Sequence, residues 1–452
     1  MPSFVNMIIS VVLGLLVLGI LVIVHELGHF LAAKYFRIRV LAFAIGFGRP
    51  LWHKEINGTD YRICSIPFGG YVHMAGEHPE DREPGAKPDP DDFTAKPTWQ
   101  RGVVAVAGPA FNFIFALVCL WVMFMVGEHR PLYLDSTVIG GTADSSTSRA
   151  AGLIAGDRII SINGTPVATW DDMEAAFSRF DREYSITVAR GDSTFTATLV
   201  MPSLKGKNLP APMAGLQTAM PPRIGAVLPG KPADKAGLRK NDLILSINGD
   251  TMGAWEGVVQ TISQYDTARG PAIIRVLRRD SVVALTILPA YDAAEKRFLI
   301  GMQAAQPESR IVKYSPRTAI VPALKKAREH AVLIFVMLRK LASREVSPQN
   351  LSGPVGIVQI SGILALLGPV VILNFMALIG INLAVLNLFP LIITDGGLLL
   401  FLLIETIRKK PLPLIMQSMI NRIAIAFFIA LFVYVTFNDI MRLPMVFEKM
   451  LR

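Results

Sequence analysis

Two histidines and a glutamate stand in the pattern H-E-x-x-H near the start of the chain, as His25, Glu26 and His29. At about 3.6 residues per turn, helical residues four apart share a face, so both imidazoles can reach one metal ion. The glutamate beside them could take a proton from metal-bound water. A chance match or two hydrogen-bonded core histidines would give the same letters. A metal site is favoured because the motif ends an uncharged run, residues 2–24, where ionisable side chains cost about 3 kcal/mol each.

Catalytic zinc sites usually have three protein ligands and leave one position open for water. The histidines supply two, and the third candidate is Asp395, the one acidic residue in the apolar region 351–404. An aspartate at membrane depth needs a partner, and the glycine pair 396–397 would let its backbone approach a metal closely. The alternative is that Asp395 only caps the next helix. These ligand types suit zinc, although cobalt or manganese would also be accepted.

The composition of the chain is that of a membrane protein. Its 452 residues are 52% hydrophobic, which excludes an ordinary soluble globule. The net charge of +10 does not indicate nucleic acid, because the basic residues cluster beside apolar runs and none of the basic stretches is interleaved with aromatics. With only Cys64 and Cys119, no disulfide framework is expected. The first apolar run lacks the basic start and small-residue cleavage site of a signal peptide.

Four apolar runs predict four transmembrane helices. They cover residues 2–24, 102–127, 351–394 and 423–438. The third run is about twice as long as one span needs. Its prolines predict a surface segment near 351–362, a span from near residue 363, and an unwound stretch at 387–390.

The basic residues beside these runs predict the orientation of the chain in the membrane. The loops 34–101 and 405–422 are expected in the cytoplasm. Both termini and the region 128–350 then lie outside, and the H-E-x-x-H motif lies near the cytoplasmic end of the first span.

The first cytoplasmic loop is expected to have two parts. Residues 41–74 alternate apolar and polar side chains around Asn57-Gly58, a strong signal for a β-hairpin. A hairpin this apolar could dip into the membrane where protein covers its backbone. Residues 77–98 are rich in proline and acidic residues and are expected to form a solvated, flexible loop.

The external region contains an internal repeat. The sequence A-G-L-x-x-x-D occurs at 151–157 and again at 236–242, and each copy is followed by S-I-N-G. Both copies resemble PDZ domains of the bacterial protease-associated kind, which add an extended peptide to a sheet edge. They could instead act as spacers or filters. In the first copy, Asp144-Ser145 stands near the expected pocket loop. For this copy the sequence favours neither peptide binding nor a spacer or filter role over the other.

A segment at 315–347 mixes lysines and arginines with apolar residues. It is expected to form an amphipathic helix on the outer membrane face. Docking on the PDZ pair is the alternative.

Four motifs together resemble the site-2 protease family of intramembrane zinc metalloproteases (peptidase family M50). They are H-E-L-G-H at 25–29, G-P-A-F-N at 108–112, N-L-F-P at 387–390 and D-G-G at 395–397. The likeness covers essentially the whole chain, including two tandem PDZ domains between the second and third spans.

The resemblance implies that each chain binds one Zn²⁺ through His25, His29 and Asp395. It also implies that Glu26 acts as the general base. It implies that the 41–74 hairpin acts as a membrane-reentrant sheet edge that guides substrate. It also implies substrate contacts from Asn382, Asn387 and Pro390. The sequence departs from the family pattern at Ile392, where a proline is usual, and at Leu398, where close relatives have a histidine. These departures put the local backbone shape in doubt more than the chemistry.

The expected fold is a multi-span α-helical membrane protein with a membrane-associated β-hairpin and two external α+β PDZ domains. The expected domains are the first transmembrane helix at 1–33, the cytoplasmic loop at 34–100, the second helix at 101–127, the PDZ domains at 128–218 and 219–308, the amphipathic region at 309–350, the third transmembrane region at 351–404, a cytoplasmic loop at 405–422, and the fourth helix and tail at 423–452.

The leading hypothesis is an intramembrane endopeptidase of the bacterial inner membrane, with the PDZ domains and both termini in the periplasm. The resemblance suggests pre-trimmed single-span substrates such as anti-sigma factors and leftover signal peptides. Peptide C-termini could also bind the PDZ domains. A non-catalytic PDZ scaffold would have no use for three metal-competent residues in membrane spans. A zinc transporter would need more polar residues in its spans than this chain offers.

Overall fold

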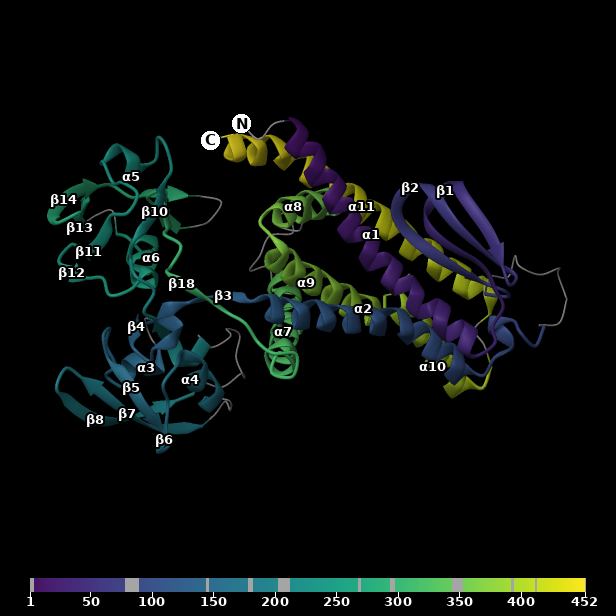
Figure 1. The fold of residues 1–452 in the computed structure, drawn as a ribbon, viewed down its shortest axis with the longest axis horizontal. Coiled ribbons are helices and arrows are strands. Elements are labelled where there is room, and N and C mark those ends of the chain that lie inside the picture. Colours follow the sequence, from purple (N-terminus) through teal and green to yellow (C-terminus); the bar gives the residue numbers. More distant parts are fainter. Residues whose placement is uncertain are drawn as a thin grey trace. The chain divides into compact units, whose positions relative to one another are not determined.

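A computed structural model gives the fold of the chain (Figure 1). It describes residues 4–77, 89–143, 146–177, 182–201, 212–266, 270–292, 297–343, 353–391, 394–410 and 413–451. Two compact units are present. The largely helical unit comprises Met1–Glu128 and Val312–Arg452, and the largely β unit comprises His129–Ile311.

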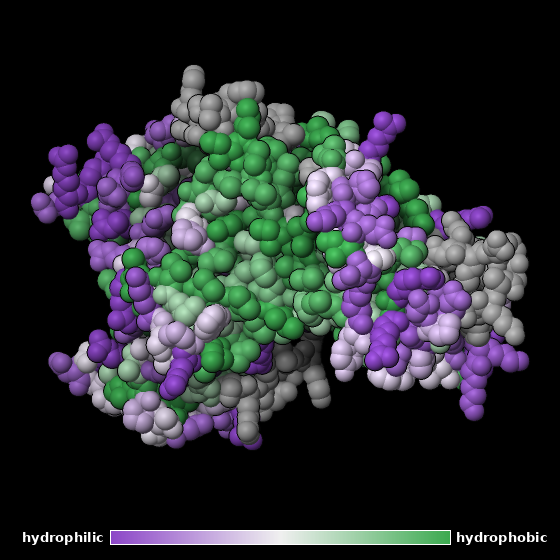
Figure 2. Space-filling model, turned by 45° about the vertical axis from the view of Figure 1, so that its right-hand side comes forward, coloured by the Kyte–Doolittle hydropathy of each residue, from purple (hydrophilic) through white to green (hydrophobic). Residues whose placement is uncertain are grey.

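The helical unit has the four long apolar helices that the sequence predicts. They are α1 (Phe4–Tyr35), α2 (Thr98–Val126), α9 (Pro369–Leu388) and α11 (Leu414–Leu451). Each contains a segment of 20 to 29 residues that is apolar enough to cross a bilayer. Apolar side chains form one broad face in the space-filling view (Figure 2), and Leu16 and Phe427 are more than half exposed. Such exposure suits helices surrounded by lipid.

The third apolar run divides differently from the prediction. Its first helix, α8 (Pro354–Leu366), is too short to span a bilayer. Gly368, with φ of 115°, separates α8 from α9, so the span begins at Pro369 and not near residue 363. Glycine adopts this angle freely, and proline suits the first helical turn. Because α9 remains helical through Asn387, the unwound stretch begins at Phe389.

The short helix α8 is held between α1 and α11. Gly14 of α1 lies against the backbone of Val358, where an added Cβ would overlap the carbonyl. Asp439 of α11 is buried and accepts hydrogen bonds from the amides of Gly353 (3.0 Å) and Gly356 (2.8 Å). Its carboxylate therefore satisfies amides at the N-terminus of α8, where the helix dipole also favours negative charge.

The amphipathic helix expected within 315–347 is α7 (Ile320–Ala342). Its Ala323 and Ala327 are buried in one apolar cluster with residues of α2 and α9. Val321 and Phe335 are exposed. The helix thus packs on the spans through an alanine face and keeps large apolar side chains outside, which favours contact with the membrane surface.

The predicted hairpin is confirmed as β1 (Val40–Ile56) and β2 (Thr59–Met74). Asn57 and Gly58 at its turn have φ of 51° and 73°. Positive angles at both positions are those of a two-residue hairpin turn. Leu51 of β1 is 73% exposed.

The hairpin folds over on itself and leaves a sheet edge. Residues 42–45 of β1 pair with residues 70–73 on one side and with residues 60–63 on the other. Among the described residues, the segment Gly70–Met74 is paired on one side only. A sheet edge of this kind is where another extended chain can add as a strand.

The loop expected at 77–98 is only partly as predicted. Its residues 78–88 lie outside the described part of the chain. Residues 89–97 are not a solvated loop, because Phe93 is buried in a cluster with Met74. The guanidinium of Arg39 also lies within 3.4–3.5 Å of the carboxylates of three aspartates: Asp89, Asp91 and Asp92.

The β unit contains the repeat as two copies with the same strand order. The first copy comprises β4 (Ile139–Thr142), α3 (Thr147–Ala150), β5 (Arg158–Ile162), β6 (Thr165–Pro166), α4 (Trp170–Ala176), β7 (Glu183–Arg190), β8 (Ser193–Val200) and β9 (Leu216–Thr218). The second comprises β10 (Ile224–Val227), α5 (Pro232–Lys235), β11 (Leu243–Ile247), β12 (Asp250–Thr251), α6 (Trp255–Ser263), β13 (Ala272–Arg278), β14 (Ser281–Ile287), β15 (Ala290–Asp292), β16 (Arg297–Leu299) and β17 (Met302–Ala304). The four-stranded sheets have the orders β6-β5-β7-β8 and β12-β11-β13-β14. In each copy the first strand also pairs with the last, β4 with β9 and β10 with β17.

The aspartate of the repeated A-G-L-x-x-x-D motif forms the same ion pair in both copies. Asp157 is buried and accepts two hydrogen bonds of 2.7 Å from the Arg190 guanidinium. Asp242 is likewise buried and accepts bonds of 2.9 and 2.7 Å from Arg278. Each arginine also donates to the carbonyl of the motif glycine. The motif is therefore explained by structure, because its aspartate ties the loop to a strand of the sheet.

These ion pairs predict how the β unit responds to acid. Burial alone would raise the pKa of Asp157 and Asp242, but the arginine hydrogen bonds lower it below the usual value. A depressed folded-state pKa gives stability that is present above the unfolded value, about 3.9, and is lost as the pH falls towards the folded value. We expect the urea concentration at which the 129–311 unit is half unfolded to decrease once the pH is lowered below about 4. Asp157→Asn should flatten this dependence. A wild-type midpoint that is constant from pH 5 to pH 3 would contradict the role of the pairs.

Candidate metal centre

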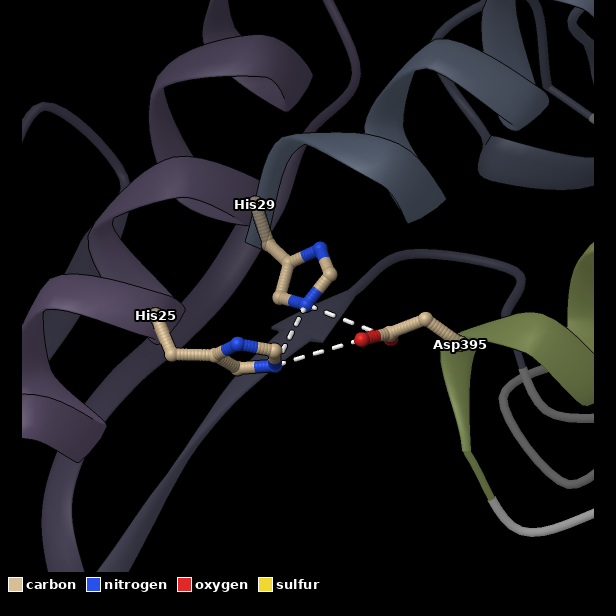
Figure 3. A group of neighbouring side chains, drawn as sticks. All are labelled: His25, His29 and Asp395. Atoms are coloured by element: carbon tan, nitrogen blue, oxygen red, sulfur yellow. Dashed lines mark hydrogen bonds and ion pairs between the residues drawn. The ribbon is translucent and has the colours of Figure 1, made fainter. Parts of the chain in front are cut away.

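The two histidines of the H-E-x-x-H motif lie one turn apart near the end of α1, and both rings point towards Asp395 of α10 (Asp395–Arg408) (Figure 3). The Nε2 atoms of His25 and His29 are 3.2 Å apart. Each lies 3.3 Å from a carboxylate oxygen of Asp395. The structure thus brings together three side chains that are far apart in the sequence.

Asp395 stands in the first turn of α10, where the chain returns after α9. The sequence left open that this carboxylate only caps the helix, but the N-cap position is occupied by Thr394, and Asp395 is the first residue of the helix itself. Gly396 directly after it is in close contact with the end of α9. A Cβ on Gly396 would lie 2.6 Å from the carbonyl oxygen of Leu388. The glycine therefore lets α10 begin directly against the end of α9.

The arrangement fits a zinc ion. Two imidazole nitrogens and a carboxylate oxygen all lie within 4.8 Å of one another, and these are the ligand types of catalytic zinc sites. Asp395 Oδ2 is buried and has no hydrogen bond of good geometry among the described residues. A buried carboxylate oxygen in this state is costly unless a cation completes its surroundings. By contrast, the acidic cluster at residues 89–92 already has the guanidinium of Arg39 beside all three carboxylates.

The three candidate ligands face a cavity of about 570 Å³. Its lining includes His25, Glu26 and His29, the sheet edge Gly70–Met74 and Asp395. Gly70 lies directly beside Glu26, because a Cβ added there would be 3.3 Å from the Glu26 Cγ. The proposed base, the ligands and a strand edge therefore share one space that could hold an extended peptide.

The three predicted substrate contacts fall in different places. Asn387 lines the cavity, with its Nδ2 3.5 Å from His25 Nε2. Asn382 does not line it, and its Oδ1 is buried without a hydrogen-bond partner among the described residues. Pro390 is exposed and also lies outside the lining. Of the two departures from the family pattern, Leu398 lines the cavity, whereas Ile392 lies outside the described residues.

The contacts that α2 makes with the two histidines were not predicted, although the G-P-A-F-N motif lies on this helix. The carbonyl of Val104 accepts a 2.8 Å hydrogen bond from Nδ1 of His29, and the amide of Asn112 lies 3.3 Å from Nδ1 of His25. Between them, Gly108 is in such close contact that a Cβ would lie 2.9 Å from the Cε1 of His25 and overlap Nε2 of His29. The spacing of four residues on one helix face was a usable signal. The carbonyl of Val104 was not, because any residue type supplies one.

Helix α10 is fixed to α2 by a buried ion pair. The Arg101 guanidinium makes two hydrogen bonds to the Glu405 carboxylate, one of them 3.2 Å long. The side chains are only 11% and 21% exposed. Because Asp395 begins the helix that carries Glu405, this pair also fixes the third ligand candidate.

We expect Glu405→Ala to lower the free energy of unfolding in mixed micelles by about 3 kcal/mol, because it leaves Arg101 buried and unpaired. The reversed pair, Arg101→Glu with Glu405→Arg, should recover part of this loss. Recovery should be incomplete because Arg101 also donates to the Lys96 carbonyl. Glu329→Ala is the matched control. It breaks the exposed Lys326–Glu329 pair, which should be worth less than about 1 kcal/mol. Equal losses in the two alanine variants would contradict the role of the buried pair.

Comparison with known proteins agrees with this geometry. The model of peptidase family M50 matches residues 13–431. Protease RseP of Yersinia pestis is 34% identical over 94% of this chain and 97% of its own length. Regulator of sigma-E protease RseP of Escherichia coli is 33% identical over 94% and 97%, and a putative zinc metalloprotease of Vibrio cholerae is 32% identical over 95% and 98%. Nothing in these comparisons favours a non-catalytic scaffold. The chain therefore belongs to peptidase family M50 and is an intramembrane zinc metalloprotease.

Proposed function

We propose that this protein hydrolyses peptide bonds in the transmembrane segments of single-span proteins that have already lost most of their external domain. The observation that carries the proposal is the shared cavity. Glu26, the two histidines and Asp395 line the same space as the sheet edge Gly70–Met74.

A transmembrane helix offers no backbone for attack, because its amides and carbonyls are paired within the helix. A substrate must therefore unwind before it can be cut. Pairing with the edge Gly70–Met74 as an added strand would replace the hydrogen bonds that unwinding breaks. Asn387, at the cavity wall, is placed to donate to a substrate carbonyl from its Nδ2.

His25, His29 and Asp395 would hold the zinc ion, which when bound supplies the Lewis acidity that activates water and polarises the scissile carbonyl. Glu26 would accept the proton of the attacking water and deliver it to the leaving amine. Its place beside Gly70 puts this carboxylate next to the strand edge on which the substrate would lie. The cavity wall would keep the unwound segment extended during both proton transfers.

The two copies in the 129–311 unit would act as PDZ domains. In support, the second copy has a hollow of about 300 Å³ lined by α6 and residues 297–304. A hollow between a helix and a sheet edge is where such domains take an extended peptide C-terminus. The pocket loop expected in the first copy, Asp144-Ser145, lies outside the described residues. We propose that the pair excludes substrates with bulky external domains, and that the second copy can also hold peptide C-termini.

The biological setting follows from the relatives. Proteins named regulators of sigma-E protease suggest anti-sigma factors as substrates, with leftover signal peptides as a second class. We place the protein in the bacterial inner membrane, with both termini and the 129–311 unit in the periplasm. Basic residues in the loops 34–101 and 405–422 support this orientation, and the metal centre would then lie near the cytoplasmic side.

The test is cleavage of a single-span protein in detergent, with its external domain either trimmed or intact. We expect the purified enzyme to cut the trimmed form inside its membrane segment, as located by mass spectrometry of the products. The intact form should be cut much more slowly. If neither form is cut and the protein holds no zinc, the proposed function is wrong.

A further inference from the structure

Helix α2 presents one residue per turn to the two histidines. Val104, Gly108 and Asn112 are spaced four apart, so they form a single stripe along the helix. Gly108 in the middle is in contact with both rings. Val104 and Asn112, on either side of it, each reach the Nδ1 atom of a different histidine. Val104 and Asn112 therefore contact the Nδ1 side of their rings, whereas the Nε2 atoms face Asp395.

For His29 the stripe determines which nitrogen carries the proton. A backbone carbonyl can only accept a hydrogen bond. The 2.8 Å contact with the Val104 carbonyl therefore requires a proton on Nδ1 of His29. Nε2 is then left with a free lone pair, and it is this atom that faces Asp395. Outer partners of this kind orient metal-binding histidines and fix their tautomer.

His25 has the same requirement, and its Nδ1 faces Asn112 at 3.3 Å. If Nε2 of His25 is to bind a metal, Nδ1 must carry a proton and needs an acceptor. The amide as placed directs its nitrogen to Nδ1 and leaves the buried Oδ1 without a partner among the described residues. The two ends of an asparagine amide are interchangeable by rotation about one bond. Only the orientation with Oδ1 towards the ring avoids two donors facing each other.

We propose that Asn112 is the positioning residue of His25, accepting a hydrogen bond from its Nδ1 and so presenting Nε2 to the metal. Helix α2 then supplies the outer shell of both histidines, one through a carbonyl and the other through an amide. This inference rests on the proposed zinc site and adds a residue to it.

The competing explanation is that Asn112 only fills space, since it is 1% exposed and its backbone lies against Gly380 of α9. Two substitutions separate the explanations. Asn112→Leu keeps the size and removes the acceptor. Asn112→Asp keeps both the size and an acceptor, as in the carboxylate–histidine–zinc arrangements found at other sites. Asn374→Leu is the matched control, because it also removes an amide from a span, a half-buried one that contacts His330 of α7.

The experiment measures zinc affinity of the full-length protein in detergent by competition with a chromophoric chelator, together with the visible spectrum of the Co²⁺-substituted protein. We expect Asn112→Leu to weaken zinc binding by about 10–100-fold and to alter the Co²⁺ bands. Asn112→Asp should stay close to wild type in both measurements, and Asn374→Leu should do the same. If Asn112→Leu does not fold, Asn112→Ala replaces it with the same expectation.

Three results would overturn the inference: unchanged affinity in Asn112→Leu, an equal loss in the Leu and Asp variants, or an equal loss in Asn374→Leu. The failure of the proposed function is distinguishable, because in that case the wild-type protein itself would hold no zinc.

Discussion

Glu26→Gln should reduce peptide cleavage by about 10²–10⁴-fold, the usual contribution of a general base, while the protein still holds one zinc ion. Glutamine has the size of glutamate but cannot take up a proton at neutral pH. Glu26 does not belong to the group of converging ligand atoms, which consists of His25, His29 and Asp395. Metal content should therefore be unaffected. The measurements are the single-turnover rate on a trimmed single-span substrate and zinc per chain by elemental analysis.

Glu77→Gln provides the comparison for this result. Glu77 lines the same cavity, and its Oε2 accepts a 3.3 Å hydrogen bond from the amide of Met74. A glutamine oxygen can accept the same bond, so the loss of this carboxylate should change the rate far less than tenfold. Cleavage by Glu26→Gln at the wild-type rate with zinc bound would show that another group is the base. A loss of zinc in Glu26→Gln would instead make Glu26 part of the metal site.

The centre could be predicted from the sequence where its geometry is local or its burial is costly. The placement of His25 and His29 follows from helical spacing alone. Asp395 is more than 360 residues away in sequence, and it could be found only because an isolated carboxylate in an apolar region needs a partner. The hairpin was predictable because Asn57-Gly58 specifies its turn.

The rest of the centre depends on how closely the helices approach one another. The hydropathy of the sequence does not predict these helix–helix contacts. The break at Gly368 lies in a run that is apolar on both sides. The role of Gly396 depends on where α9 ends. Asn112 stood out in the sequence as a polar residue in a span and as the end of the G-P-A-F-N motif, but its contact with His25 could not be predicted because that ring belongs to another helix.

The close approach of α1 and α2 gives the second large effect. Gly108→Ala should abolish stable zinc binding, because the added Cβ would overlap Nε2 of His29 and lie 2.9 Å from Cε1 of His25. Either the rings turn away or the helices move apart. Gly28 of α1 is also pressed against the carbonyl of Ala107, so neither backbone can shift without opening the contact. A displacement of about 1 Å at a reacting group can cost about 10²-fold in rate.

The effect of Gly108→Ala on helix stability is opposite to its expected effect on zinc binding, which makes this variant informative. Alanine is favoured over glycine in a helix interior by about 1 kcal/mol, so Gly108→Ala should not unfold α2. Gly102→Ala on the same helix is the matched control. Its Cβ would meet only the Leu399 Cδ2 at 3.8 Å, an ordinary contact, and both zinc content and cleavage should be retained. Because the two variants gain the same helical preference, a difference in their zinc content must come from the histidines. Equal zinc content in both variants would show that the histidine rings tolerate an added methyl group at position 108. The contact between α1 and α2 would then not define the metal centre.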